Sequence, residues 1–380
     1  MKIRARWLLE RDQLAMDRLV TVENGRIAEV APCRGDAGDC FFEYLTPGLM
    51  DLHCHGGEGF STLDGDLTTI GPFLNRMLEA GVTDHLLTLS AAPADVMRRG
   101  LEIARQAMRL QAEGALGGSR ILGVHLEGPF LSGASAGAML PGAIVPPDVA
   151  AYQAYFDGYE DIIRLVTLAP EEGDADGLMR WLRGAGVRVQ AGHTAATYDQ
   201  AVHAFANGAE SLCHSFNACR GIHHREPGVV VAAMEQPDVY MEAICDLEHL
   251  HPATIRLIYR EKGPERMIVI SDSTATHGLP DGDYPFEGYV IRVRNGVSRT
   301  ESGALDGGGA YLDQEVRNLV SIGIPLPHAL RMASGTPARR MGLDGLGEIR
   351  PGAEARLVGW DSALRPVAAV MGTRVHRWEN

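Results

Sequence analysis

Six acid and imidazole side chains stand at the ends of short apolar runs, and segments of helical length separate most of these runs. The six are His53, His55, Glu127, His193, His214 and Asp272. Apolar runs of this length, bounded by glycine and polar residues, are typical of strands buried in a parallel sheet. In a (β/α)8 barrel, the carboxyl ends of the strands build the active site. The pattern therefore predicts a barrel whose mouth gathers these six side chains.

Eight runs in all have the character of buried strands. They cover residues 49–53, 84–89, 121–126, 164–168, 188–191, 210–213, 240–245 and 267–270. Helical periodicity appears between several of them, at residues 95–112, 197–207 and 252–261. Eightfold alternation of strand and helix predicts an α/β fold, a (β/α)8 TIM-type barrel, over residues 49–339.

The two ends of the chain have a different pattern, one of short strands and tight turns. Near the N-terminus, Asn24-Gly25 separates two alternating segments, and Asn295-Gly296 does the same late in the barrel region. Asn-Gly between such segments is a strong hairpin signal. Three further strand candidates lie at residues 355–360, 367–371 and 374–378. We expect residues 1–48 and 340–380 to form one small, discontinuous β-sandwich domain.

Composition excludes several classes of protein. A chain of 380 residues with 45% hydrophobic content can bury one large core and a smaller one. Its formal net charge of -14 argues against binding to nucleic acid or to an anionic membrane. Six cysteines without a C-x-x-C pair favour a reducing compartment. No signal peptide and no membrane-length apolar stretch is visible, so we expect a cytoplasmic protein.

His53 and His55 are two residues apart on a strand, so both imidazoles face the same side and Cys54 points away. Such a pair suits a divalent transition metal, although hydrogen-bonded core histidines would have the same spacing. Glu127 ends an apolar run, and a buried carboxylate needs a metal or a strong cation as partner. His125 shares the parity of Glu127 but lies deeper in the barrel, where it supports the site or packs in the core.

Together, Glu127, His193 and His214 form a plausible ligand set for one catalytic metal with a position left for water. Asp272, at the end of the eighth strand, is placed as a general base that passes a proton from water to a leaving group. A helix cap is the structural alternative for Asp272. Histidine and carboxylate ligands accept Zn²⁺, Fe²⁺, Mn²⁺ or Co²⁺, and we expect one or two such ions.

Basic residues gather in the loop that follows His214. Arg220, His223, His224 and Arg225 lie there, and His249 follows the seventh strand. In an acidic protein, this patch beside a metal site indicates a substrate with a phosphate or a carboxylate. A solvated charged loop is the alternative, because Glu226 and Glu248 dilute the patch.

The chain resembles the N-acetylglucosamine-6-phosphate deacetylase family of the amidohydrolase superfamily over nearly its whole length. The matching stretches include Pro47-Gly48-Leu49-Met50-Asp51-Leu52-His53-Cys54-His55-Gly56, His125-Leu126-Glu127-Gly128-Pro129-Phe130, Gly192-His193-Thr194, His214-Ser215-Phe216-Asn217-Ala218 and His223-His224-Arg225-Glu226-Pro227-Gly228. The second and last of these are specific to this family. The resemblance implies deacetylation of N-acetylglucosamine 6-phosphate to glucosamine 6-phosphate and acetate, in amino-sugar catabolism.

Carried over residue by residue, the resemblance implies a principal metal on Glu127, His193 and His214. A second metal in some members is held by residues that match His53 and His55, and Asp272 matches the catalytic aspartate. The positions that contact substrate are matched by Ala138, Asn217, Ala218, Arg225, His249, Leu305, Asp306 and Gly307. In the family, the arginine that Arg225 matches crosses a dimer interface, so the resemblance also implies a homodimer.

Lysine is found only at Lys2 and Lys262. Related amidohydrolases bridge two metals with a carboxylated lysine after the fourth strand, where this chain has Glu171. Glu127 must therefore supply any bridging carboxylate.

Two loops depart from the family pattern. Ala136-Gly137-Ala138-Met139 stands where Lys-Gly-Ala and then His or Gln are usual, and Leu305-Asp306-Gly307-Gly308 replaces Leu-Ala-Gly-Ser. Met139 and Asp306 leave open a related amidohydrolase acting on N-acetylgalactosamine 6-phosphate or on an unphosphorylated amide. A non-catalytic sugar-phosphate sensor on the same fold is the alternative from another class of protein.

Overall fold

The computed structural model describes residues 1–35, 38–286 and 289–378, and it contains the eight parallel strands that the sequence predicts. The strands of this sheet are β5 (Leu49–Cys54), β8 (Val82–Ser90), β9 (Arg120–Glu127), β10 (Ile163–Leu168), β11 (Arg188–Ala191), β12 (Ser211–Leu212), β13 (Tyr240–Ala243) and β14 (Met267–Val269). Their spatial order follows their order in the chain. Contacts between His53 and Asp272 and between Cys54 and Ser273 join the last strand end to the first, which closes the barrel.

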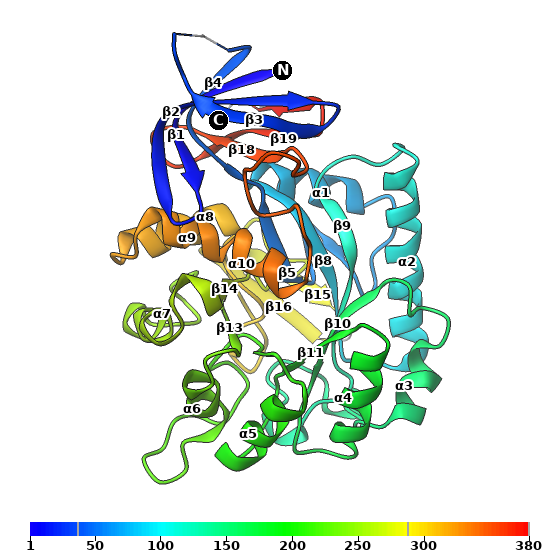
Figure 1. The fold of residues 1–380 in the computed structure, drawn as a ribbon. Helices are drawn as coiled ribbons and strands as arrows, with labels where there is room; N and C mark the ends of the chain where they lie inside the picture. Colours follow the sequence, from blue (N-terminus) through cyan, green and yellow to red (C-terminus); the bar gives the residue numbers. More distant parts are fainter. Residues whose placement is uncertain (36–37, 287–288, 379–380) are drawn as a thin grey trace.

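A helix lies between each barrel strand and the next barrel strand, and another follows β14; these helices surround the sheet (Figure 1). They are α1 (Ile70–Glu79), α2 (Ala94–Ala112), α3 (Val149–Phe156), α4 (Ala175–Gly184), α5 (Tyr198–Asn207), α6 (Gly228–Glu235), α7 (Pro252–Arg266) and α8 (Leu312–Ser321). Helices α9 (Leu326–Met332) and α10 (Gly335–Arg340) complete the barrel region. Leucine, isoleucine, valine and alanine fill the space between strands and helices, as parallel strands buried on both faces require.

The two ends of the chain form one seven-stranded sheet beside the barrel (Figure 1). Its strands, in spatial order, are β20 (Arg374–Arg377), β19 (Pro366–Met371), β18 (Arg356–Trp360), β4 (Cys40–Pro47), β1 (Lys2–Glu10), β2 (Gln13–Glu23) and β3 (Arg26–Pro32). Edge strand β3 bonds to residues 352–355, just before β18, so the sheet folds back around a shared core. The discontinuous β-structure expected from the sequence is thus present.

Both Asn-Gly hairpins form as predicted, because asparagine and glycine accept the positive φ that such turns require. Asn24 and Gly25 have φ of 50° and 76°, and Asn295 and Gly296 have φ of 52° and 74°. The second hairpin joins β16 (Tyr289–Arg294) to β17 (Val297–Arg299), and β15 (Gly282–Phe286) adds a third strand that the sequence did not indicate. This insertion lies between β14 and α8 and leads into the loop with Leu305 and Asp306.

The barrel interior near the site is polar. The rings of His53 on β5 and His125 on β9 are in edge contact, with centroids 4.6 Å apart, although β8 separates their strands in the sheet. Both side chains therefore point into the barrel. His125 is fully buried and bonds to the hydroxyls of Thr88 and Thr167, so it supports the site from below as expected.

Across the described residues, no helix has the length and apolar character needed to cross a bilayer.

Candidate metal centre

Three of the predicted ligands converge at one point of the barrel mouth. Glu127 is the last residue of β9, and His193 and His214 each follow a strand by two residues, β11 and β12 respectively. Glu127 Oε1 lies 3.0 Å from His193 Nε2 and 2.8 Å from His214 Nε2, and the two nitrogens are 3.1 Å apart. All three side chains are nearly inaccessible to solvent. The structure thus brings together the set predicted for a principal metal.

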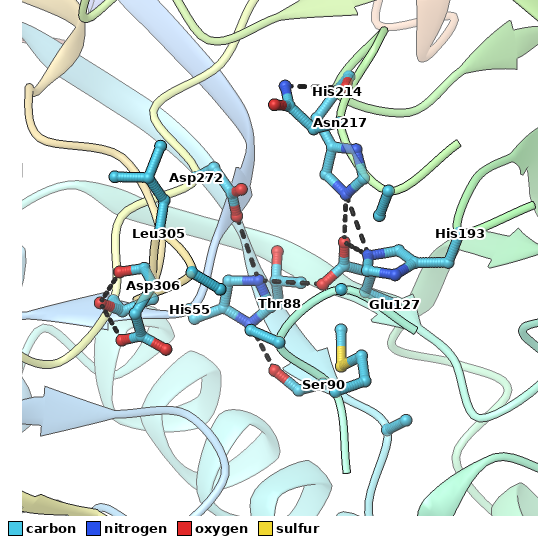
Figure 2. Close-up of a pocket in the computed structure, with 18 of the residues that line it drawn as sticks. His55, Thr88, Ser90, Glu127, His193, His214, Asn217, Asp272, Leu305 and Asp306 are labelled. Atoms are coloured by element: carbon cyan, nitrogen blue, oxygen red, sulfur yellow. Dashed lines mark hydrogen bonds and ion pairs between the residues drawn. The ribbon is translucent and has the colours of Figure 1, made fainter. Parts of the chain in front are cut away.

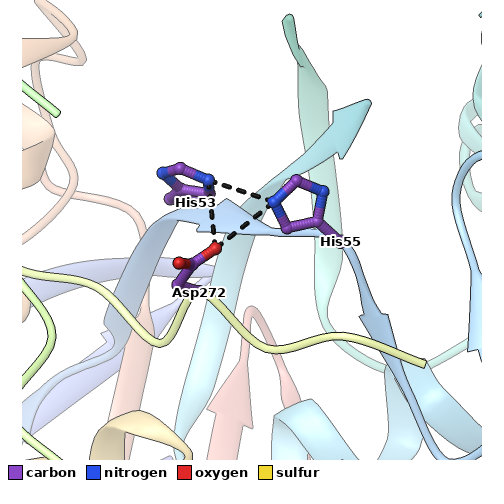
Figure 3. Close-up of side chains that lie close together, drawn as sticks. All are labelled: His53, His55 and Asp272. Carbon is purple, nitrogen blue, oxygen red and sulfur yellow. Dashed lines mark hydrogen bonds and ion pairs between the residues drawn. The ribbon is translucent and has the colours of Figure 1, made fainter. Parts of the chain in front are cut away.

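The other three predicted ligands form a second group (Figure 3). His53 Nε2 and His55 Nε2 are 3.2 Å apart, and Asp272 Oδ1 lies 3.2 Å from the first and 3.3 Å from the second. The i, i+2 spacing places both imidazoles on one side, as expected, while the Cys54 thiol bonds to the Leu86 carbonyl elsewhere.

Glu127 connects the two groups through both of its oxygens. Oε1, which contacts His193 and His214, is also 3.4 Å from His53 Nε2, and Oε2 is 3.1 Å from His55 Nε2. If two ions were bound, Glu127 would be placed to serve both ligand sets with its one carboxylate. The lysine count predicted this role for Glu127.

The donor atoms of both groups fit a small divalent cation. With metal–ligand bonds of about 2.0–2.1 Å, the donors of a tetrahedral site lie about 3.3 Å apart, close to the separations in both groups. In two of the histidines, the ring nitrogen that faces away from the centre has a hydrogen-bond partner that fixes the ring's orientation. His193 Nδ1 donates to the carbonyls of Ser135 and Ala136, which leaves the Nε2 lone pair for a cation. His55 Nδ1 lies 3.0 Å from Ser90 Oγ.

The electrostatic environment of Glu127 and Asp272 also favours metal binding. Burial alone would raise the pKa of Glu127, but His53, His193 and His214 hold it well below its usual value. Asp272 is also buried, yet His53 and His55 keep its pKa below the ordinary value. Both carboxylates are therefore ionised at neutral pH, as metal ligands must be.

Several of these ligands have a strained backbone. His193, His214 and Asp272 have φ of 45°, 21° and 49°, in the left-handed region that non-glycine residues rarely adopt. Such conformations persist only where the surrounding structure holds them, and they cluster at functional sites. The strain supports a functional role for these positions.

The Asp272 segment is held by the loop that carries Leu305 and Asp306. Gly308 N donates to the carbonyl of Asp272 at 2.8 Å. A Cβ on Gly307 would lie 2.6 Å from that same carbonyl oxygen, and one on Gly308 would lie 1.9 Å from the Ser271 carbonyl oxygen. The loop therefore needs glycine at both positions to approach the eighth strand end so closely.

Replacing Gly308 by alanine is expected to lower Tm, because the new methyl group would force two backbone segments apart. Overpacking of this kind costs about 1–3 kcal/mol. Gly309→Ala is the matched control, since the nearest atom to its Cβ would be Asp246 Oδ2 at 3.7 Å. Thermal unfolding of both variants tests the packing, and equal Tm values would contradict it.

A cavity of about 300 Å³ opens beside the metal ligands (Figure 2). Its lining includes seven of the eight residues predicted to contact substrate, which are Ala138, Asn217, Ala218, His249, Leu305, Asp306 and Gly307. Met139 and five of the predicted metal ligands, His55, Glu127, His193, His214 and Asp272, also line it. His249 Nδ1 lies 2.8 Å from Asp246 Oδ2, and this contact orients the ring so that its other nitrogen can bind a ligand.

Arg225 is the eighth predicted contact, and it does not line this cavity. Its side chain is exposed on the loop before α6, where Nη1 lies 2.7 Å from His224 Nε2. Within one chain, the basic loop therefore places Arg225 outside the cavity.

Among the residues that the structure describes, sequence reasoning missed three that touch the centre. Cys213 Sγ lies 3.5 Å from His53 Nδ1 and forms a third candidate ligand group with His53 and Glu242. Glu242 on β13 is 1% exposed, and its Oε2 lies 3.9 Å from His53 Nδ1. Ser90, at the end of β8, contacts His55. Glu242 stands in an apolar strand, so the argument applied to Glu127 would have indicated it. A serine at a strand end carries no comparable signal.

Comparison with known proteins places these features in context. The profile of the amidohydrolase family matches residues 44–378. An N-acetylgalactosamine-6-phosphate deacetylase of Escherichia coli is 35% identical over 95% of this chain and 95% of its own length. An N-acetylglucosamine-6-phosphate deacetylase of Vibrio furnissii is 34% identical, with 94% and 90% covered.

Solved structures agree with these sequence matches. N-acetyl-D-glucosamine-6-phosphate deacetylase of Mycobacterium smegmatis, in a mutant form in complex with N-acetyl-D-glucosamine-6-phosphate, superimposes with a TM-score of 0.91. It is 32% identical, with 99% of this chain and 98% of that chain covered. The Thermotoga maritima N-acetylglucosamine-6-phosphate deacetylase gives a TM-score of 0.88 at 28% identity, with both chains covered completely (100%).

Proposed function

Because the chain belongs to the amidohydrolase family, we propose that it is a metal-dependent deacetylase that hydrolyses N-acetylglucosamine 6-phosphate to glucosamine 6-phosphate and acetate. The observation that carries the proposal is the convergence of both ligand groups on the cavity that holds the predicted substrate contacts. A non-catalytic sensor would not need Asp272 held beside two metal ligands.

Glu127, His193 and His214 would hold the principal ion, and His53, His55 and Asp272 a second one. When bound, a divalent ion there polarises the amide carbonyl and lowers the pKa of water. Imidazole and carboxylate donors accept Zn²⁺, Fe²⁺, Mn²⁺ or Co²⁺.

Asp272 is the proposed general base and acid. Its carboxylate takes a proton from the attacking water as the water oxygen bonds to the amide carbon. It then gives that proton to the amide nitrogen as the carbon–nitrogen bond breaks, which releases acetate and the amine. With a divalent ion held by His53 and His55, the neighbouring Asp272 carboxyl would stay ionised before the reaction, as a base must be.

N-acetylgalactosamine 6-phosphate is the second candidate substrate. The Escherichia coli relative that carries this name matches over nearly its full length. The two sugars differ only in the orientation of the 4-hydroxyl, so residues lining the pocket decide between them. Comparing kcat/KM for both phosphorylated sugars and for their unphosphorylated forms, with acetate release as readout, tests the proposed function. Equal or better turnover of an unphosphorylated amide would contradict it.

We further propose that the protein is a homodimer in which Arg225 reaches the partner's cavity. Its exposed position outside its own cavity supports this, since an arginine fork on an exposed loop suits bidentate binding of a phosphate. The six cysteines form no disulfide, which supports a cytoplasmic location.

Arg225→Ala is expected to raise KM for the phosphorylated sugar by roughly ten- to a hundredfold. A charge-assisted hydrogen bond to phosphate in a partly dry pocket is worth about 1.5–3 kcal/mol. Hydrolysis of an unphosphorylated N-acetyl sugar should barely change. Arg260→Ala, which removes an exposed arginine from α7, is the control. An equal effect of Arg225→Ala on both substrates would rule out the phosphate contact.

A further inference from the structure

Asp306 places a third carboxylate in the cavity, in addition to Glu127 and Asp272. It is 8% exposed and lies in the loop between β17 and α8, on the side of the cavity where Asp272 and His55 stand (Figure 2). Asp306 is therefore part of the surface that a ligand in this cavity contacts.

The partners of Asp306 leave much of its accepting capacity unused. Thr274 Oγ1 lies 3.3 Å from Asp306 Oδ2 and 3.1 Å from the Asp306 carbonyl, and one hydroxyl proton cannot satisfy both. Among the described residues, no arginine, lysine or histidine forms an ion pair with this carboxylate. A carboxylate has about four lone-pair directions, so Asp306 can accept further hydrogen bonds from a ligand in the cavity.

The position of Asp306 is set by backbone contacts. Its N–H donates to the Ser298 carbonyl at 3.0 Å. The two glycines that follow Asp306 pack closely against the backbone of Ser271 and Asp272. The carboxylate is therefore a preorganised acceptor beside the reacting groups. Preorganised polar groups of this kind are the ones that fix ligand orientation and specificity.

The chemistry of the substrate leaves one kind of partner. Asp306 belongs to none of the candidate ligand groups, so no bound ion would compensate its negative charge and a phosphate beside it is disfavoured. The amide nitrogen faces Asp272 in the proposed reaction. The remaining hydrogen-bond donors are hydroxyl groups, on the sugar ring or on a hydroxylated acyl group.

We propose that Asp306 is a specificity-determining residue whose carboxylate accepts a hydrogen bond from a hydroxyl group of the substrate. This inference rests on the proposed function and adds the group that the enzyme recognises near its metal centre. The two sources of the hydroxyl are the sugar ring and an N-glycolyl group, and they are separable by matched substrate pairs.

The test measures kcat/KM for pairs of substrates in which one hydroxyl is either present or replaced by hydrogen or methyl, with the metal-loaded protein. N-acetylglucosamine 6-phosphate is compared with its 3-deoxy and 4-deoxy analogues, and the N-glycolyl sugar phosphate with the N-propionyl one. In the wild type, one pair should differ by about ten- to a hundredfold, as expected for a hydrogen bond to a charged group. In Asp306→Ala this ratio should fall to near one. The pair that responds identifies the hydroxyl.

Two further variants keep the outcome interpretable. Asp306→Asn retains an accepting oxygen and a similar shape, so it should keep part of the ratio even if the alanine variant unfolds. Glu301→Gln removes an exposed carboxylate from the same loop and should leave every ratio unchanged. Wild-type turnover with ratios that neither Asp306 variant alters would overturn this inference alone. No turnover of any N-acylated hexosamine phosphate by the wild type would instead contradict the proposed function.

Discussion

Replacing Asp272 by asparagine is expected to reduce kcat by roughly two to four orders of magnitude, the usual contribution of a general acid–base group. Asparagine has nearly the same shape but cannot accept the proton from water or return it to nitrogen. Glu127, His193 and His214 are untouched, so the principal ion should stay bound. The measurement is steady-state acetate release together with elemental analysis of the purified variant.

The geometry makes this a sharp test. Asp272 Oδ1 lies 3.2 and 3.3 Å from two imidazole nitrogens, and the Asp272 side chain lines the cavity. Asp64→Asn, which changes an exposed aspartate, is the control for a general effect of lost charge. A near-normal kcat for Asp272→Asn, with metal retained, would remove Asp272 from the mechanism.

Glu127→Gln is expected to have the largest effect, because it should empty the principal metal site and abolish turnover. The carboxylate lies within 3.1 Å of three imidazole nitrogens, those of His193, His214 and His55. A neutral amide is a far weaker ligand than a carboxylate, and here one amide would have to replace contacts to both groups. Metal content and kcat of the same preparation measure the effect.

Glu235→Gln on the surface of α6 is the matched control, with full metal and full activity expected. Full metal occupancy of Glu127→Gln with activity retained would mean that the ligand set has been assigned wrongly. Loss of activity with both ions retained would place Glu127 in the chemistry and not in metal binding.

The agreement between sequence and structure is best where the sequence pattern is periodic. The eight barrel strands were predicted because parallel strands buried on both faces are short apolar runs, and β5 and β9 begin and end within one residue of the prediction. The six ligands were predicted because an acid or imidazole group at the end of a buried run is costly to bury without a partner. Their common location then follows from the rule that carboxyl strand ends meet at one mouth.

Sequence patterns predicted less of the structure where it depends on contacts between segments that are distant in the chain. Strand β15 and the three-stranded insertion were not fully predicted, because their pairing involves a long loop with weak local signals. Glu242 was not predicted, although it approaches His53 across the barrel. The position of Arg225 outside its own cavity also follows from the path of a loop, which composition does not specify.

By itself, the sequence determined the fold class, the candidate metal ligands and the likeness to sugar-phosphate deacetylases, because strand periodicity and ligand chemistry are local properties. The sequence also suggested a bridging role for Glu127 and a substrate contact for Asp306. Only the tertiary structure decided the distances that make them possible, such as 3.1 Å between Glu127 and His55 and 3.3 Å between Asp306 and Thr274. Such distances result from barrel closure and from glycine-permitted close packing, and no local pattern encodes them.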